Sequence, residues 1–102
     1  MIVSLSATSA DVVEADDCTR LHVATSLSSG TADAALRASG IGRLDPGGEA
    51  LLDLETLRTR ARADAREPGW DEKWSKMIDY ARGKGWVTDA AVRAHVEYGA
   101  SA

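Results

Sequence analysis

Three side chains of this 102-residue sequence are of the types that carry catalysis or bind metals: its one cysteine and its two histidines. Cys18 and His22 are four residues apart, so a strand would place both on one face. Together with His95 and Asp16 or Asp17, they could form a Cys/His/His/Asp metal site or a cysteine–histidine nucleophile pair. The sequence lacks the paired elements of strong metal sites, and a lone cysteine usually packs as a small hydrophobic residue. We therefore predict no metal and no cofactor, and keep Cys18, His22 and His95 as candidate catalytic residues.

The two histidines form a candidate site of their own. If the first and last strands pair, His22 and His95 meet, and their imidazoles could line a polar pocket with a general base. The alternative is that both are half-exposed on the solvated face of a sheet, where polar residues alternate outward without a function. The second alternative is favoured, because polar residues that alternate outward need no function.

A stripe of arginines could bind an anion. Arg58, Arg62 and Arg66 recur at i, i+4 and i+8, and such a stripe could hold a phosphate, a carboxylate or an acidic partner. Glu55 and Asp64 lie among them, so pairing along the helix is the alternative. We keep the three arginines as anion-binding candidates.

All three tryptophans lie within residues 69–86 of a sequence that has no phenylalanine. Trp70 and Trp74 share one helical stripe with Met77, which favours a core, with a subunit interface second and a ligand-stacking site third. Trp86 follows Gly85, beyond that helix, and is a candidate for a pocket mouth or a dimer seam. We keep Trp70, Trp74, Met77 and Trp86 as ligand or interface candidates.

The elements that must position these residues begin with strands. Residues 2–27 are rich in β-branched residues and predict two or three strands, with a turn at 15–17. Residues 28–40 predict a short helix capped by Thr31 at its start and by Gly40 at its end.

The middle of the chain, residues 46–66, is either one long helix or a turn, a strand and a helix. Two consecutive glycines at 47–48 cost a helix about 1 kcal/mol each, which favours the turn, with Asp53 as the N-cap of the following helix. Residues 70–82 give the clearest helix pattern, and residues 92–98 alternate as a strand does. We expect residues 98–102 to form a loose tail.

Composition bounds the class of protein. The length predicts one domain, 1–102, and 44% apolar residues suit a folded chain. A net charge of −4 disfavours nucleic acid as a partner, and no apolar run is long enough for a membrane. The lone cysteine and the absence of a basic, apolar leader favour a cytoplasmic location.

These elements predict an α+β fold: a small antiparallel or mixed sheet of about four to five short strands, with three helices packed on one face. Such a sheet leaves a face or an edge uncovered, which favours a homodimer.

Three functions remain as hypotheses. The first is a non-catalytic, homodimeric binding or interaction module whose surface includes the Trp70–Trp74–Met77 helix, with a protein or small-molecule partner. The second is a small enzyme with a His22/His95 pocket that could include Cys18 and a metal. The third is a DNA-binding regulator that uses the hairpin at 47–48 as a wing, which the acidic charge disfavours.

Overall fold

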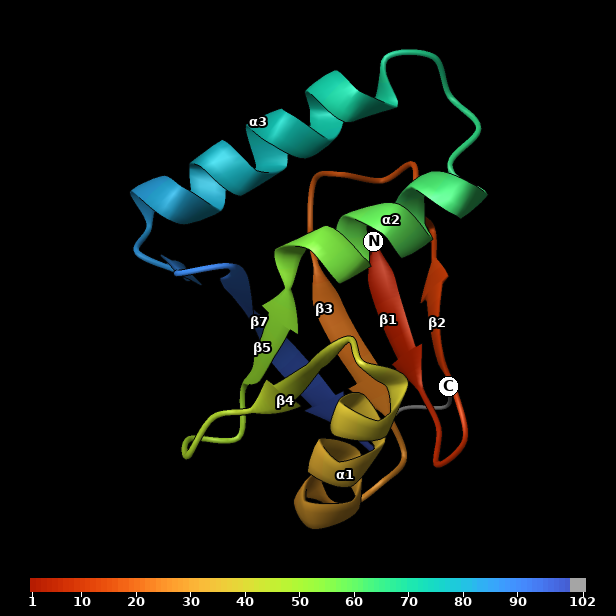
Figure 1. Ribbon diagram of the computed structural model, residues 1–102, viewed down its shortest axis with the longest axis vertical. Helices are drawn as coiled ribbons and strands as arrows, with labels where there is room; N and C mark the ends of the chain where they lie inside the picture. The colour runs from red at the N-terminus through yellow and green to blue at the C-terminus, as the bar shows by residue number, and fades with distance from the viewer. Residues whose placement is uncertain (100–102) are drawn as a thin grey trace.

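The computed structural model describes residues 1–99, which form three helices and seven strands (Figure 1). In chain order they are β1 (Ile2–Leu5), β2 (Ala10–Val13), β3 (His22–Thr25), α1 (Ser29–Ser39), β4 (Gly42–Leu44), β5 (Ala50–Asp53), α2 (Leu54–Asp64), α3 (Trp70–Gly83), β6 (Val87–Thr88) and β7 (Ala91–Tyr98). None of the helices formed by residues 1–99 combines the length and the apolar character that crossing a membrane requires.

The strands form one curled, mixed sheet in the order β2-β1-β3-β7-β5-β4, and β6 pairs with β7. β1, β3 and β7 are parallel to one another, whereas all other pairs are antiparallel. The long strand β7 joins two wings, because its second half pairs with β3 and its first half pairs with β5 and β6. The α+β class is confirmed, but the sheet is larger than the four to five strands expected.

One face of the sheet carries the core. Buried and exposed residues alternate along the strands, and the buried set includes Val3, Leu5, Val23, Leu52 and Val92. Helices α1 and α2 cover this face and lie in front of β1 and β3 in Figure 1. Helix α3 instead packs against α2 and β6, so the expectation of three helices on one face holds for two of them.

The helix ends follow the local signals, with one exception. Asp53 caps α2, since its carboxylate accepts from the backbone N–H of Thr56 at 2.9 Å. Gly40 ends α1 in the left-handed conformation, with φ of 76°. The prediction that Thr31 caps α1 is wrong, because the helix begins at Ser29 with Ser28 as its N-cap. The Ser28 side chain makes no capping hydrogen bond and lies 3.1 Å from the Thr31 hydroxyl, but its carbonyl accepts from the backbone N–H of Ala32 at 2.8 Å, so the first helical turn already includes Thr31.

The turn before α2 and the terminal strand are confirmed. Residues 45–48 form the turn between β4 and β5, so residues 46–66 are not one helix. Tyr98 is not part of a loose tail: it ends β7, and its hydroxyl donates to the carbonyl of Gly48 at 2.8 Å. The rest of the predicted tail beyond Gly99 lies outside the described residues.

Candidate functional site

Cys18 and His22 do not share a strand. Cys18 lies in the turn before β3, half-buried against the core, and its Sγ is 3.8 Å from the carbonyl oxygen of Ala15. Burial raises the pKa of the Cys18 thiol above its ordinary value, which opposes formation of the nucleophilic thiolate. Within residues 1–99 no three histidine, cysteine, aspartate or glutamate side chains gather as metal ligands would. The predicted cysteine–histidine pair on one strand is therefore wrong.

The two histidines do meet. β3 and β7 pair in a register that makes His22 and His95 direct neighbours. The imidazole Nε2 of His22 lies 3.7 Å from a carboxylate oxygen of Glu97, and the His22 side chain is 17% exposed. His95 is exposed, on the sheet face that the helices leave open. The pair therefore lies on the sheet face that the helices leave open, as the outward-alternation alternative expects.

Trp70 and Trp74 belong to the chain's own core. They are 4% and 6% exposed, their rings stack with centroids 5.6 Å apart, and the Trp70 indole N–H donates to the carbonyl of Ala15 at 2.7 Å. Met77 is partly buried against the same core. Both rings therefore lie in the core of the chain, which is the role that their helical stripe favours.

Trp86 is the tryptophan that reaches the surface. Its side chain is 42% exposed and packs edge-on against Tyr80, with ring centroids 6.0 Å apart. Its carbonyl accepts from the backbone N–H of Arg93 at 2.7 Å, which extends the β6–β7 ladder by one residue. Trp86 thus stands beside β7 at one end of the open sheet face.

The arginine stripe already holds a carboxylate from the same chain. Arg58 donates to Asp71 of α3 at 2.9 Å, and Arg62 pairs with the other oxygen of the same carboxylate. The backbone N–H of Arg66 donates a hydrogen bond to the Asp16 carboxylate at 3.0 Å. The partner of the stripe comes from the next helix rather than from Glu55 or from Asp64 along α2. A phosphate would have to compete with Asp71 for two of the three arginines.

The sheet face turned away from α1 and α2, called here the open face, carries two parallel rows of side chains across β2, β1, β3 and β7. The histidine row contains Val13, Ile2, His22 and His95. The acidic row contains Asp11, Ser4, Ala24 and Glu97. Residues two apart on a strand share a face, so the two rows lie side by side, about 7 Å apart. One row is bulky throughout, and the other is small in the middle and acidic at both ends.

Sequence reasoning named the two histidines but missed the other members of these rows. Their only local signal was alternation along short strands, which does not reveal which strands are neighbours. The order β2-β1-β3-β7 brings into one row residues that are up to 93 positions apart, such as Ser4 and Glu97. The open face is therefore a product of topology.

The β2 and β4 edges of the sheet each receive a hydrogen bond that involves a helix side chain. At the β2 edge, Arg60 of α2 donates to the carbonyl of Ala10 at 3.3 Å. At the β4 edge, the backbone N–H of Leu44 donates to the Asp33 carboxylate of α1 at 2.8 Å. Native proteins cover sheet edges in this way to prevent pairing with another strand.

No family model, no curated protein and no solved structure matches this chain.

Proposed function

We propose that this protein is a non-catalytic interaction module that pairs with a second copy of itself through the open face. The observation that carries the proposal is the self-complementary pattern of the histidine row and the acidic row. The hydrogen bonds at the β2 and β4 edges and the half-buried thiol with a raised pKa support it, because they disfavour strand addition at these edges and cysteine catalysis.

In the proposed dimer two copies pack open face to open face. The two-fold axis runs parallel to the two rows and midway between them. It therefore places the histidine row of each copy on the acidic row of the other. His95 then faces Glu97 of the other copy, so opposite charges meet when the imidazole is protonated. Ile2 and His22 face Ser4 and Ala24, so large side chains meet small ones. Three of the four positions in each row therefore fit in shape or charge, as an isologous interface requires, whereas the fourth sets Val13 against Asp11.

The size of this face sets the expected strength of the contact. Four strands about 4.8 Å apart, with four residues of about 3.3 Å rise each, cover roughly 250 Å². A standard stable interface buries about 800 Å² on each partner. The expected dimer is therefore weak and transient, and a stable, permanent homodimer would need further contacts.

The open His22/His95 pair supports a second candidate function, proton-transfer catalysis, because the two imidazoles are direct neighbours beside Glu97. The bound substrate would have to supply the walls of the site, since the two imidazoles project from the open sheet face. A His22→Ala variant that keeps every ligand and activity of the parent protein would exclude this candidate.

Sedimentation equilibrium tests the self-pairing proposal, at protein concentrations up to about 1 mM because small interfaces are weak. We expect the parent protein to associate reversibly and Glu97→Lys to raise the dissociation constant about ten-fold, since the lysine would face His95 of the second copy. Glu55→Lys is the matched control, because Glu55 is exposed on α2, away from the open face, and the charge change is identical. A parent protein that stays monomeric throughout, or a Glu97→Lys variant that associates like the parent, would refute the proposal.

The cytoplasm remains the expected location, because a lone thiol is maintained in a reducing compartment. The acidic net charge of −4 continues to argue against nucleic acid as the partner.

A further inference from the structure

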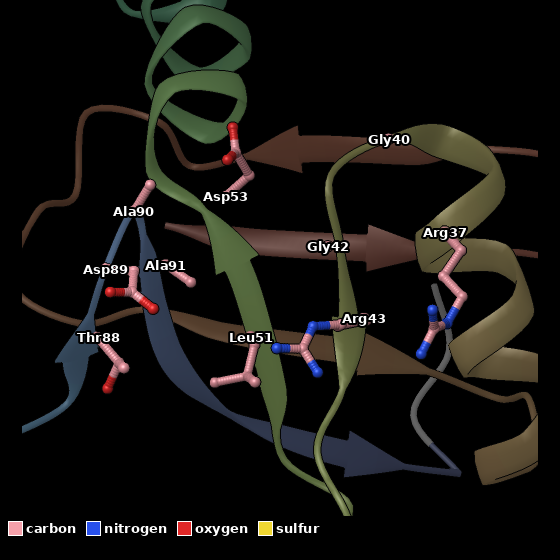
Figure 2. A pocket seen from close by; sticks show the side chains of 10 residues that line it. All are labelled: Arg37, Gly40, Gly42, Arg43, Leu51, Asp53, Thr88, Asp89, Ala90 and Ala91. Atoms are coloured by element: carbon pink, nitrogen blue, oxygen red, sulfur yellow. The ribbon is translucent and has the colours of Figure 1, made fainter.

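The second wing of the sheet, formed by β4, β5, β6 and the first half of β7, carries a cavity of about 400 Å³ (Figure 2). It shares β7 with the histidine row and the acidic row, but it adjoins the first half of β7, whereas the rows cross the second half. The lining residues used below are Arg37, Arg43, Leu51, Asp53, Asp89 and Ala91. This cavity is independent of the self-pairing proposal, because none of its lining residues belongs to the histidine row or the acidic row.

The cavity has a cationic wall. Arg37 near the end of α1 and Arg43 on β4 lie on the same side of it in Figure 2. The Nε of Arg37 donates to Asp33 at 2.9 Å, whereas the guanidinium of Arg43 has no hydrogen-bond or ion-pair partner among residues 1–99. A guanidinium in this position is prepared to receive a carboxylate from outside the chain.

The opposite wall is anionic. Asp89, in the turn between β6 and β7, lies across the cavity from the two arginines (Figure 2). Its carboxylate also lacks a partner among residues 1–99, and its backbone adopts φ of 54°, which aspartate and asparagine tolerate better than most residues. Asp53 lines the cavity as well, but one of its oxygens caps α2. Asp89 is thus the carboxylate available to an external cation.

The floor between the walls is apolar and sets the length of a ligand. Leu51 of β5 and Ala91 of β7 lie between Arg43 and Asp89. β4 and β6 are three strand steps apart, which is about 14 Å between their backbones. A ligand that touches both walls must therefore carry its two charges at opposite ends of an extended aliphatic chain.

We infer that this cavity binds a small linear zwitterion of the ω-amino acid class. Its carboxylate pairs with Arg43, with Arg37 beside it, and its ammonium group pairs with Asp89. The methylene chain crosses Leu51 and Ala91. A free carboxylate or a free amine of the same length satisfies only one wall and leaves the other charge without its partner.

Titrations of the ¹⁵N-labelled protein followed by NMR test this inference, with ε-aminocaproate as the probe and with caproate and hexylamine as single-charge analogues. We expect saturable shifts at the amides of Leu51, Thr88 and Ala91 with ε-aminocaproate, and binding about ten-fold weaker for each analogue, which lacks one charge-assisted contact.

Two variants separate the walls of the cavity. Arg43→Gln and Asp89→Asn are each expected to weaken ε-aminocaproate about ten-fold, and asparagine keeps the positive-φ turn folded. Arg20→Gln is the control, because Arg20 is an exposed arginine outside the cavity. Absence of saturable shifts, or an unchanged affinity in Arg43→Gln or Asp89→Asn, would overturn the inference. Equal binding of caproate would reassign the cavity to simple anions and would overturn it as well.

Discussion

Trp70→Ala is predicted to remove a large share of the folding stability. The side chain is 4% exposed, and it stacks on Trp74 with ring centroids 5.6 Å apart. Burial of an indole removes about 200 Å² from water, which at about 25 cal/mol per Å² gives an upper limit near 5 kcal/mol. Measured truncations of buried tryptophan to alanine cost about 3–5 kcal/mol. A domain of this size is stable by roughly 5–15 kcal/mol in total, so this single change would remove a fifth or more of it.

Trp70→Phe measures how much of that loss of stability is due to the hydrogen bond of the Trp70 indole. The indole N–H of Trp70 donates to the carbonyl of Ala15 at 2.7 Å, and phenylalanine leaves this buried carbonyl without its donor. The expected cost is about 1–3 kcal/mol. Trp86→Ala is the matched control, because Trp86 is 42% exposed, and it should cost about 1 kcal/mol or less.

Urea unfolding followed by far-ultraviolet circular dichroism measures these losses without relying on tryptophan fluorescence. The expected order of destabilisation is Trp70→Ala, then Trp70→Phe, then Trp86→Ala. If Trp70→Ala does not fold at all, the stability losses of Trp70→Phe and Trp86→Ala are compared instead. A Trp86→Ala variant that loses as much stability as the Trp70 variants would refute the assignment of Trp70 to the core.

Two further predictions concern stability. Gly42→Ala should destabilise the protein by about 1–3 kcal/mol in urea unfolding, because an added Cβ would overlap the carbonyl oxygen of Leu51. A Cβ added at Gly30 of α1 has no atom within 4 Å, so Gly30→Ala should stabilise the protein by about 0.4–1 kcal/mol. Equal effects of the two changes on stability would contradict the close packing of β4 on β5. The pKa of Asp53 is below its ordinary value because the backbone N–H of Thr56 donates to the carboxylate, so the unfolded chain takes up this proton first and stability falls as pH drops below about 4. In thermal unfolding at acid pH, Asp53→Asn should lose less stability than the parent, and an identical pH dependence would show that the cap does not titrate.

The helices and the terminal strand were predictable because their signals are local. The stripe from Trp70 to Ala81 repeats at helical spacing, and four of its members are buried in α3. Asp53 precedes the helix that it caps, and the alternation of residues 92–98 is that of β7. In each case, residues close in sequence determined the element.

The candidate site was less predictable because its contacts are distant in sequence. The turn predicted at 15–17 extends past Cys18, and no local signal separated residues 18–21 from the strand that begins at His22. Asp71 neutralises Arg58 and Arg62 only because α3 packs on α2. The register of β3 on β7, which sets His22 beside His95, is decided by tertiary packing.

The cavity on the second wing illustrates the same limit. Arg43 and Asp89 are 46 positions apart and lie on different strands or turns, so neither has a sequence neighbour that indicates the other. The glycines near Arg43 were visible in the sequence, but the need for Gly42 comes from the close approach of β5. Charged walls of this kind become apparent only when the strand order is known.

The most direct test of self-pairing through the open face is sedimentation of a mixture of His95→Glu and Glu97→Lys. Alone, each variant sets like charges against each other in both symmetry-related contacts between residues 95 and 97 when the imidazole is protonated, so neither should associate as the parent does. Mixed in equal amounts, one copy of each restores opposite charges at both positions, and a mixed dimer with an affinity at least equal to that of the parent is predicted. A mixture that remains as monomeric as its separate components would contradict the proposed pairing of the histidine row with the acidic row.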